Sequence, residues 1–328
     1  HSQERVTYGT IYFPLGYLAI AIGFWQYSEF IIISLAILSV ADPIAAVIGE
    51  NKSKHNKFII WKDKKTIQGT ITFYSISFFL ILLLGKLLFQ FSNSYLLCFA
   101  LFSAIGSTIA EITSSKGSDN LSIPIVSVLF MIGFVERITP NQSDFFTILS
   151  SPFLITILFL ALIFYIAFKL KTLSLDGFLG AFLMGAIIIL VGSIYFFMLL
   201  AIFFIFSSVL SKILKRASFY RTKGSERDIL QVYANGGIAL LLSIIYFLNN
   251  DPVYIYLFAS SVAAAMSDTW GTEFGKLSKH KPISITSLKS IDHGISGGIT
   301  RVGTLGSLLG SSIVGFFTWL IIPIPTHI

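Results

Sequence analysis

The sequence predicts an all-α, polytopic integral membrane protein with about 11 transmembrane helices in two related halves. Of its 328 residues, 55% are hydrophobic and only 12% are charged, whereas soluble proteins carry about 25% charged residues. The apolar residues gather into segments of about 20, the length at which a helix crosses a bilayer. The basic residues gather between these segments, as in the loops that fix membrane topology. These observations argue against soluble enzymes, disordered tails and nucleic-acid-binding proteins.

The apolar segments follow one another along the whole chain. They cover residues 9–26, 30–49, 67–91, 94–111, 121–137, 145–168, 173–191, 193–213, 231–249, 252–270 and 295–322. The seventh and eighth segments are divided near Gly192. The last segment is long and rich in glycine, which predicts a broken helix or two short ones. Because the chain opens with His1 and an apolar run already begins at Ile11, we expect its natural start to lie further upstream.

Charge alone predicts the orientation. If the amino terminus is cytoplasmic and every segment crosses, the basic loops at residues 50–66, 212–228 and 276–292 all face the cytoplasm. The exceptions among the 23 lysines and arginines are Lys86, Arg137 and Arg301. Cytoplasmic loops of membrane proteins carry an excess of Lys and Arg. We therefore expect an integral protein of a bacterial inner membrane with its active sites at the cytoplasmic face. The net charge of +7 then reflects topology, and no nucleic-acid partner is expected.

Four acidic residues end apolar segments on the predicted cytoplasmic side: Asp42, Glu111, Asp268 and Glu273. An ionised group within a membrane segment costs about 2.5–3.5 kcal/mol on insertion scales, so each of them needs a reason. One alternative is that they mark helix ends at the interface or pair with nearby lysines. Because all four lie beside basic loops, a site for Mg²⁺ and nucleotide phosphates is the favoured interpretation.

An internal repeat links the two halves. Asp42 is followed seven residues later by Gly49, and Asp268 is followed seven residues later by Gly275. Each pair precedes a lysine-rich loop and a short glycine-containing motif that is predicted to open the next helix. These motifs are Lys65-Thr66-Ile67-Gln68-Gly69-Thr70 and His293-Gly294-Ile295-Ser296-Gly297-Gly298. A glycine-rich helix start offers free N–H groups to a phosphate, so the repeat predicts two related phosphate sites.

Two further polar clusters lie on the same side. Asp119 follows a serine-rich turn, and Arg227-Asp228 lead into a segment where Gln231 and Asn235 share one helix face. The alternatives are a helix cap for Asp119 and a solvated interface pair for Arg227-Asp228. Buried amides need hydrogen-bond partners, so the face with Gln231 and Asn235 favours a ligand.

The first half resembles the membrane-bound phytol kinase and dolichol kinase family of CTP-dependent polyprenol kinases. The matching segments are Asp42-Pro43-Ile44-Ala45-Ala46 through Gly49, Lys65 through Thr70, and Glu111 through Asp119-Asn120 with Pro124. This family is distantly similar to the cytidylyltransferases that make CDP-diacylglycerol. The resemblance implies a prenol kinase-like membrane domain over residues 1–145, which lacks membrane sequence that normally precedes it.

The second half resembles the integral-membrane phytyl-phosphate kinase family, and this match is denser. Its segments are Arg227-Asp228 with Gln231-Val232, Ala234-Asn235-Gly236, Asp268-Thr269-Trp270 with Glu273 and Gly275, Ser296-Gly297-Gly298, and Gly303-Thr304. The resemblance implies a prenyl-phosphate kinase-like membrane domain over residues 146–328.

Together the resemblances imply salvage of isoprenoid alcohols by two sequential phosphorylations. A prenol such as phytol, geranylgeraniol or farnesol becomes the monophosphate in the first half and the diphosphate in the second, using CTP or another nucleoside triphosphate with Mg²⁺. On this hypothesis Asp42 and Asp268 bind the metal. The other catalytic candidates are Glu111, Asp119, Asp228 and Glu273. The nucleotide- and phosphate-binding candidates are Lys65, Gly69, Arg227, Gln231, Asn235, Gly297 and Gly298.

Two other functions stay open at this point. A cytidylyltransferase acting on a lipid phosphate would use similar chemistry but would leave CMP on the lipid. A transporter built from repeats would suit the intramembrane carboxylates, although transporter sites lie near the midplane and the charges here gather at one face. In the kinase interpretation the partners are prenol and prenyl-phosphate substrates in the bilayer, a nucleotide and membrane lipids.

Overall fold

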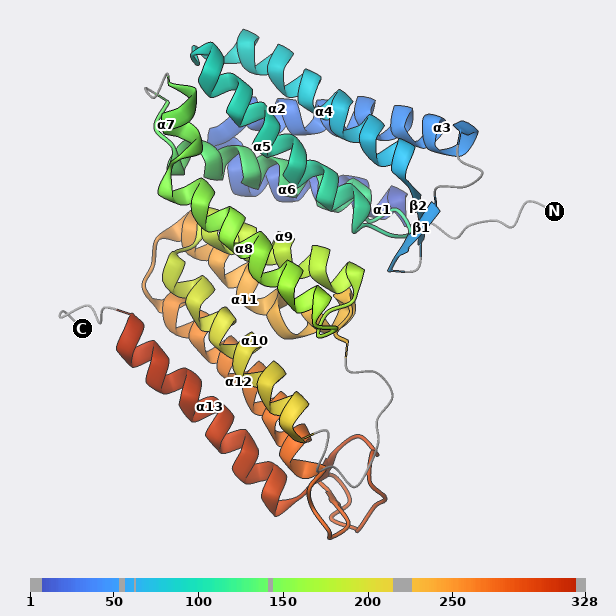
Figure 1. The fold of residues 1–328 in the computed structure, drawn as a ribbon, viewed down its shortest axis with the longest axis vertical. Helices are drawn as coiled ribbons and strands as arrows, with labels where there is room; N and C mark the ends of the chain where they lie inside the picture. Colours follow the sequence, from blue (N-terminus) through green and yellow to red (C-terminus); the bar gives the residue numbers. More distant parts are fainter. Residues whose placement is uncertain (1–7, 53–56, 62, 141–143, 215–225, 323–328) are drawn as a thin grey trace. The chain divides into compact units, whose positions relative to one another are not determined.

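The computed structural model describes residues 8–52, 57–61, 63–140, 144–214 and 226–322. Parts of the predicted basic loops, residues 53–56, 62 and 215–225, lie outside the described residues. The described chain is almost entirely helical (Figure 1), which confirms the predicted all-α class. It divides into two compact units, His1–Val191 and Gly192–Ile328. The boundary between these units lies after Val191, and the 145/146 division implied by the resemblances stays a prediction.

Among the described residues, eight helical runs are long and apolar enough to cross a membrane. They are Gly9–Glu50, Ile67–Leu88, Asn93–Ile112, Asp119–Arg137, Pro152–Lys169, Ile194–Leu214, Ile229–Asn249 and Arg301–Ile321. The first run is 42 residues long. It turns back on itself, so it accounts for two of the predicted apolar segments. The shorter apolar helix Leu175–Val191 and the helix Val253–Gly275 match the remaining two segments.

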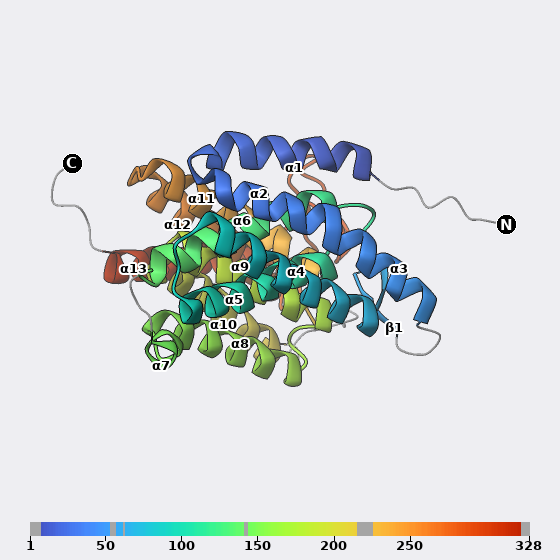
Figure 2. The same ribbon diagram turned by 90° about the horizontal axis from the view of Figure 1, so that it is seen from above.

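The first run contains three α-helices joined by irregular turns. Helix α1 (Gly9–Phe24) ends in a 3-10 turn, after which α2 (Ser28–Ala36) returns alongside it (Figure 2). A π-helical turn at Ile37–Ala41 then leads into α3 (Asp42–Lys52). Such π turns are frequent at functional sites, and this one ends directly before Asp42.

The other described elements of the first unit include the buried helix pair at its centre. They are the hairpin strands β1 (Lys57–Ile60) and β2 (Asp63–Thr66), and the helices α4 (Ile67–Leu88), α5 (Asn93–Ile112), α6 (Asp119–Arg137), α7 (Phe145–Leu149), α8 (Pro152–Lys169) and α9 (Leu175–Val191). Helices α5 and α6 pack on each other in the centre, with α4 against α5 and α1, α2 and α9 against α6. Gly106 permits this approach, because a Cβ there would lie only 2.3 Å from the ring of Phe130.

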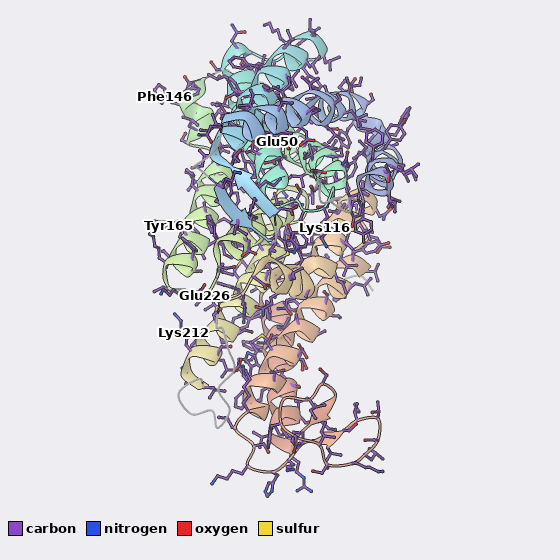
Figure 3. The ribbon with its side chains drawn as sticks, turned by 90° about the vertical axis from the view of Figure 1, so that its right-hand side faces the viewer. Glu50, Lys116, Phe146, Tyr165, Lys212 and Glu226 are labelled. Carbon is purple, nitrogen blue, oxygen red and sulfur yellow. The ribbon has the colours of Figure 1, made fainter. Side chains whose placement is uncertain are left out.

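The polar connections of the first unit gather at one end of its helices. The end of α3, the β-hairpin, the start of α4 and the turn between α5 and α6 all lie there (Figure 1). Figure 3 shows Glu50 and Lys116 close to the hairpin at this end. The opposite pattern, with polar side chains along the spans, would cost several kcal/mol per group in hydrocarbon.

The described part of the second unit consists of four long helices and a two-stranded ribbon. They are α10 (Ile194–Leu214), α11 (Ile229–Asn249), α12 (Val253–Gly275) and α13 (Arg301–Ile321), with strands β3 (Ile283–Ser284) and β4 (Gly298–Ile299). Helices α12 and α13 form the closest pair. On α13, a Cβ at Gly303 would lie 2.9 Å from the Gly271 oxygen, and one at Gly306 would lie 2.7 Å from Phe274. The glycines therefore serve close helix packing.

The last apolar segment differs from the prediction. It is neither a broken helix nor two short ones, because α13 is a single helix that begins only at Arg301. Gly297 has a φ of +82° and Gly294 a φ of +89°, which a right-handed helix does not accommodate. Residues 293–298 are thus a turn and part of a strand, and they do not open the helix as predicted.

Candidate functional site

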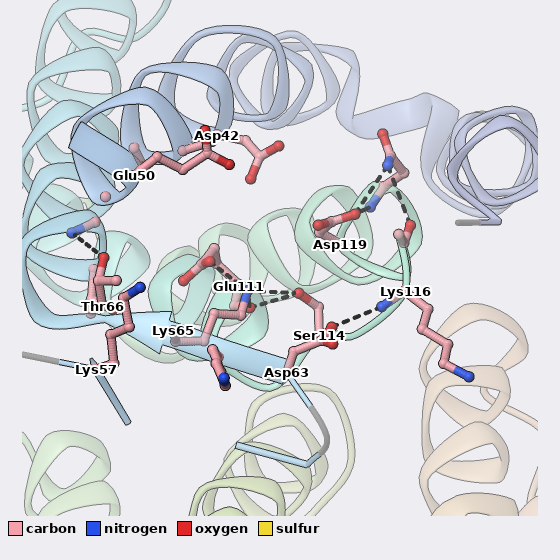
Figure 4. Close-up of a pocket in the computed structure, with 18 residues that line it drawn as sticks. Asp42, Glu50, Lys57, Asp63, Lys65, Thr66, Glu111, Ser114, Lys116 and Asp119 are labelled. Atoms are coloured by element: carbon pink, nitrogen blue, oxygen red, sulfur yellow. Dashed lines mark hydrogen bonds and ion pairs between the residues drawn. The ribbon is translucent and has the colours of Figure 1, made fainter. Parts of the chain in front are cut away.

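All five site residues predicted in the first half line one cavity. Asp42, Lys65, Gly69, Glu111 and Asp119 contribute to a cavity of about 820 Å³ at the polar end of the first unit (Figure 4). Ligand pockets of drug-sized molecules span about 300–1,000 Å³. The cavity is therefore large enough for a nucleotide, and the residues come from five separate elements, α3, β2, α4, α5 and α6.

Charged side chains of both signs line this cavity. Its described lining includes the acidic residues Asp42, Glu50, Asp63, Glu111 and Asp119, and the basic residues Lys57, Lys64, Lys65 and Lys116. Figure 4 shows the carboxylates of Asp42, Glu111 and Asp119 pointing toward the same open space. Asp42 is half-buried and lies within electrostatic range of the other two and of Lys65. A metal-bound nucleotide carries the matching combination of cation and phosphates.

The β-hairpin delivers Lys65 to Glu111. Lys65 pairs with Phe58 across the hairpin, and its Nζ lies 2.6 Å from Glu111 Oε1 and 2.8 Å from the Glu111 backbone oxygen. Their side chains are only 16% and 13% exposed. A lysine at the carboxyl end of a helix also satisfies a carbonyl that lacks a helical partner. Lys65 thus ties the hairpin to α5, and its charge is already shared with a carboxylate.

The second carboxylate oxygen of Glu111 lacks a hydrogen-bond partner among the residues that the structure describes. Glu111 Oε2 is buried and has no hydrogen-bond partner in the described part of the chain. An unsatisfied buried polar atom costs about 1–3 kcal/mol. A cation bound in the cavity would relieve that cost.

The turn between α5 and α6 forms another wall. The backbone N–H of Lys116 donates to Asp63 Oδ2 at 3.0 Å, which joins this turn to the hairpin. Lys116 and Gly117 have φ values of +51° and +88°. Asp119 begins α6, and its Oδ1 accepts from the backbone N–H of Asn120 at 2.8 Å. The alternative of a helix cap by Asp119 is not what the structure shows, because Ser118 occupies the N-cap position of α6 and no side chain makes a capping hydrogen bond there. Asp119 lines the cavity from the first turn of α6.

Gly69 has a structural task that the sequence interpretation did not include. Thr66 caps α4 by accepting from the Gly69 N–H at 3.1 Å. A Cβ on Gly49 would lie 2.7 Å from Thr66 Oγ1, and a Cβ on Gly69 would lie 3.2 Å from the Ala45 oxygen. Gly69 therefore permits the contact between α3 and α4 as well as lining the cavity.

Several lining residues were not singled out as site residues from the sequence. They are Glu50, Lys57, Asp63, Lys64, Thr66, Thr70, Ser114, Lys116 and Asn120. Lys57 and Lys64 belong to the basic run at residues 50–66, which in the sequence is a signal of topology. The pairing of Asp63 with the distant Lys116 turn left no signal in the sequence.

The metal assignment can be compared with the donors present. No group of three or more His, Cys, Asp or Glu side chains placed to hold a metal occurs among the residues that the structure describes. Mg²⁺ is usually held by one or two carboxylates, with water and substrate phosphates completing its shell. Asp42 and the unpartnered Glu111 Oε2 fit that mode, in which the nucleotide brings the ion.

In the second unit, the predicted residues lie at the amino end of α11 and near the carboxyl end of α12. Asp228 caps α11 by accepting from the Gln231 N–H at 2.9 Å. The Arg227 guanidinium lies 5.6 Å from the ring centres of Phe203 and Phe204. Burial lowers the pKa of Arg227, and the charge of Glu273 acts against that shift.

Glu273 is also held by two other side chains. It accepts from Ser211 Oγ at 3.2 Å and from Lys276 Nζ at 3.0 Å. Asp268 is exposed on α12, whereas on α11 Gln231 is exposed and Asn235 half-buried. Gly297 and Gly298 are exposed in the ribbon segment before α13. The structure therefore brings Arg227 and Glu273 together and removes Gly297 and Gly298 from the helix start.

Comparison with known proteins places the chain in a family. Residues 158–327 match the family described as integral membrane protein DUF92. The chain is 33% identical over 154 residues to an uncharacterized membrane protein, MJ0933, of Methanocaldococcus jannaschii, which is 47% of this chain and 64% of that protein. It is 31% identical over 179 residues to Protein PGR of Arabidopsis thaliana, covering 49% of this chain and 62% of that protein.

The chain thus covers less than two thirds of the length of these relatives. No solved structure matches the chain. The matched segment, residues 158–327, comprises 170 of the 328 residues. The chain therefore belongs to the integral membrane protein family DUF92.

Proposed function

We propose that this membrane protein is a phosphotransferase that converts an isoprenoid alcohol into its monophosphate and then into its diphosphate. The donor is CTP or another nucleoside triphosphate with Mg²⁺. The observation that carries the proposal is the cavity of the first unit, where Asp42, Glu111 and Asp119 face lysines at the end of apolar helices. The resemblances of the two halves to prenol and prenyl-phosphate kinases support the division of labour.

The location of the cavity suits a substrate with an apolar tail and a polar head. The tail dissolves among the lipid chains, so the hydroxyl group stays at the interface. The cavity lies at the polar end of the spans, where that hydroxyl can meet a water-soluble nucleotide. An interfacial site therefore needs no channel through the protein for either substrate.

Phosphoryl transfer depends on positioning and charge neutralisation. The alcohol oxygen attacks the γ-phosphorus, the bond from that phosphorus to the β–γ bridging oxygen breaks, and the nucleoside diphosphate leaves. Asp119 accepts the proton of the alcohol. Lysines that line the cavity, Lys65 together with Lys57 and Lys64, are proposed to stabilise the phosphate oxygens. Asp42 and Glu111 would hold Mg²⁺, which when bound neutralises charge on the β- and γ-phosphates.

In the second unit, the substrate already carries a phosphate. Asp268 is the proposed metal ligand, and Glu273 and Asp228 are the further acidic candidates. Arg227 supplies a cation that stays charged at any physiological pH. Gln231 and Asn235 are proposed to contact the nucleotide from α11.

The test separates this reaction from the alternatives. Purified protein in detergent is incubated with farnesol or geranylgeraniol and with CTP labelled at either the γ- or the α-phosphate. We expect γ-label in the prenyl phosphate. Transfer of α-label would identify a cytidylyltransferase and overturn the proposal. Absence of any transfer, together with substrate flux in vesicles, would identify a transporter.

A further inference from the structure

The contact between α3 and α4 is built from two glycines and one threonine. Thr66 caps α4 and accepts from the Gly69 N–H. A Cβ on Gly69 would lie 2.8 Å from Thr66 Oγ1, 3.2 Å from the Ala45 oxygen and 3.6 Å from Gly49 Cα. The capping hydroxyl is thus held between the two helices, and neither glycine tolerates a side chain without movement.

The contact between α12 and α13 uses the same chemistry. Thr300 caps α13 and accepts from the Gly303 N–H at 3.0 Å. A Cβ on Gly303 would lie 2.9 Å from Thr300 Oγ1, 2.9 Å from the Gly271 oxygen and 3.3 Å from Gly275 Cα. Each neighbour of Gly69 in the first unit therefore has a counterpart around Gly303 in the second.

The sequence spacing of the two sets agrees with this correspondence. The residues whose carbonyl oxygens lie near Gly69 and Gly303 are Ala45 and Gly271. They lie four residues before Gly49 and Gly275, respectively. Each capping threonine lies three residues before the glycine of its own helix, Gly69 or Gly303. The acidic residues Asp42 and Asp268 both lie seven residues before that first glycine. Seven residues are two helical turns, so each acid lies on the helix face that carries the contact.

We infer that Asp268, Gly275, Thr300 and Gly303 reproduce the arrangement of Asp42, Gly49, Thr66 and Gly69, and that Thr66 and Thr300 are positioning residues for two related sites. This inference rests on the proposed function. It replaces Gly297 and Gly298 with Thr300 and Gly303 as the counterpart of the first-unit motif. We name each set of glycine, threonine and glycine a helix clamp.

The clamps explain how an acidic residue is held against the next helix. In each clamp the threonine hydroxyl fixes the amino end of the second helix by its cap. It lies closer to the first glycine in the first unit, where a Cβ on Gly49 would be 2.7 Å from Thr66 Oγ1, than in the second, where a Cβ on Gly275 would be 3.6 Å from Thr300 Oγ1. The acid two turns away then has a fixed distance to the N–H groups at that end. A displacement of about 1 Å at a reacting group costs about 100-fold in rate, so this distance matters for transfer.

The two clamps differ in their surroundings. From glycine to threonine the first loop runs from 49 to 66 and the second from 275 to 300, so the second is eight residues longer. Lys65 directly precedes the first threonine, whereas Ile299 precedes the second and Arg301 follows it. A shared scaffold with different cations suits two substrates that differ by one phosphate.

The experiment replaces each hydroxyl in the full-length protein. Thr66→Val should lower kcat for phosphorylation of the alcohol by about 100-fold and leave its KM unchanged. The monophosphate should still react at the wild-type rate. Thr300→Val should lower kcat for phosphorylation of the monophosphate and leave that of the alcohol at the wild-type rate. Thr66→Ser and Thr300→Ser keep the hydroxyl, so both variants should react at the wild-type rate. Thr156→Val and Thr318→Val are matched controls, because their hydroxyls bond only within α8 and α13.

Hydrogen exchange at the Gly69 and Gly303 amides supplies a readout that does not depend on catalysis. Each valine variant should speed exchange at its own glycine and leave the other unchanged. Full activity of Thr300→Val, or loss of both reactions in either folded variant, would overturn the positioning role. If wild-type protein transfers no phosphoryl group, the proposed function fails and the catalytic role fails with it. Faster exchange at Gly69 in Thr66→Val and at Gly303 in Thr300→Val would then still establish the repeated clamp. An effect at one of the two glycines without the other would overturn it.

Discussion

At the scale of single residues, the most informative pair is Lys65 with Glu111. The sequence places them 46 positions apart, yet they form the closest ion pair in the cavity wall. The pair is more than four-fifths buried on both sides. Each of the two charges therefore needs the other, because a largely buried charge without a counter-ion lowers the stability of the folded state.

Removing one partner should destabilise the first unit. Lys65→Met leaves a largely buried carboxylate without its cation, and we expect a loss of about 3 kcal/mol. Thermal unfolding of purified protein in detergent measures the change. The double variant Lys65→Met with Glu111→Gln should recover most of it. If the two single effects simply add in the double variant, the pair is not coupled.

The acidic residues of the two units allow a test of separate sites. Asp42→Asn should block phosphorylation of the alcohol and spare that of the monophosphate, because the change removes one carboxylate charge without changing shape. Asp268→Asn should give the opposite pattern. Product analysis of each reaction measures both rates. Loss of both activities in a folded single variant would contradict two independent sites.

Substitutions of Asp228 can distinguish a structural from a catalytic role of its carboxylate. Its carboxylate caps α11, and asparagine caps helices as well as aspartate does. Asp228→Asn should therefore keep the stability, while Asp228→Ala should lose about 1 kcal/mol. Melting temperatures and the rate of the second phosphorylation are measured together. A stable Asp228→Asn protein without activity would assign the carboxylate to catalysis, whereas full activity would assign it to the cap.

At the scale of helices, glycine decides how closely α12 and α13 approach. A Cβ at Gly306 would meet Phe274 at 2.7 Å, close to the backbone end of that side chain. The phenylalanine cannot swing away at that point without moving its helix. Small residues are a common basis of helix association in membranes, where lipid offers no hydrophobic driving force.

Gly306→Ala should lower the stability by about 1–3 kcal/mol through overpacking. Gly315 on the same helix is the matched control, because a Cβ there meets nothing within 4 Å. Gly315→Ala should unfold at or above the wild-type temperature, since alanine is the better helix former. Equal melting temperatures for the two variants would contradict this prediction, because they would show that α12 and α13 can move apart without loss of stability.

At the scale of the whole molecule, the charge pattern predicts which side of the membrane each unit's candidate residues face. Each unit carries its candidate residues at one end of its helices, and the charge pattern predicts that both ends face the cytoplasm. The single cysteine of the chain, Cys98, is buried. An introduced cysteine can therefore be labelled selectively.

Lys57→Cys and Lys289→Cys should react with a membrane-impermeant maleimide only from the cytoplasmic side. Lys86→Cys should react only from the opposite side. Labelling of intact cells against inverted vesicles measures the side, and the unsubstituted chain gives the background from Cys98. Reaction of Lys57→Cys and Lys289→Cys from different sides would contradict a common face for the two units.

The sequence by itself determined the membrane class and the positions of the helices. Apolar length and loop charge are local properties, so they could be recognised without knowing any contact. The sequence also selected Asp42, Lys65, Gly69, Glu111 and Asp119, because charge in an apolar segment is conspicuous wherever the chain folds. All five line one cavity.

Only the tertiary structure decided how these groups engage one another. It paired Lys65 with Glu111, placed Thr66 against Gly49 and moved the start of the last helix from the predicted residue 295 to Arg301. The physical reason is that the ion pair and the contact of Thr66 with Gly49 depend on groups far apart in the chain. Such contacts form when two elements meet, and spacing within one element does not encode that meeting. The start of the last helix depends on positive φ angles at Gly294 and Gly297, which the sequence permits but does not specify.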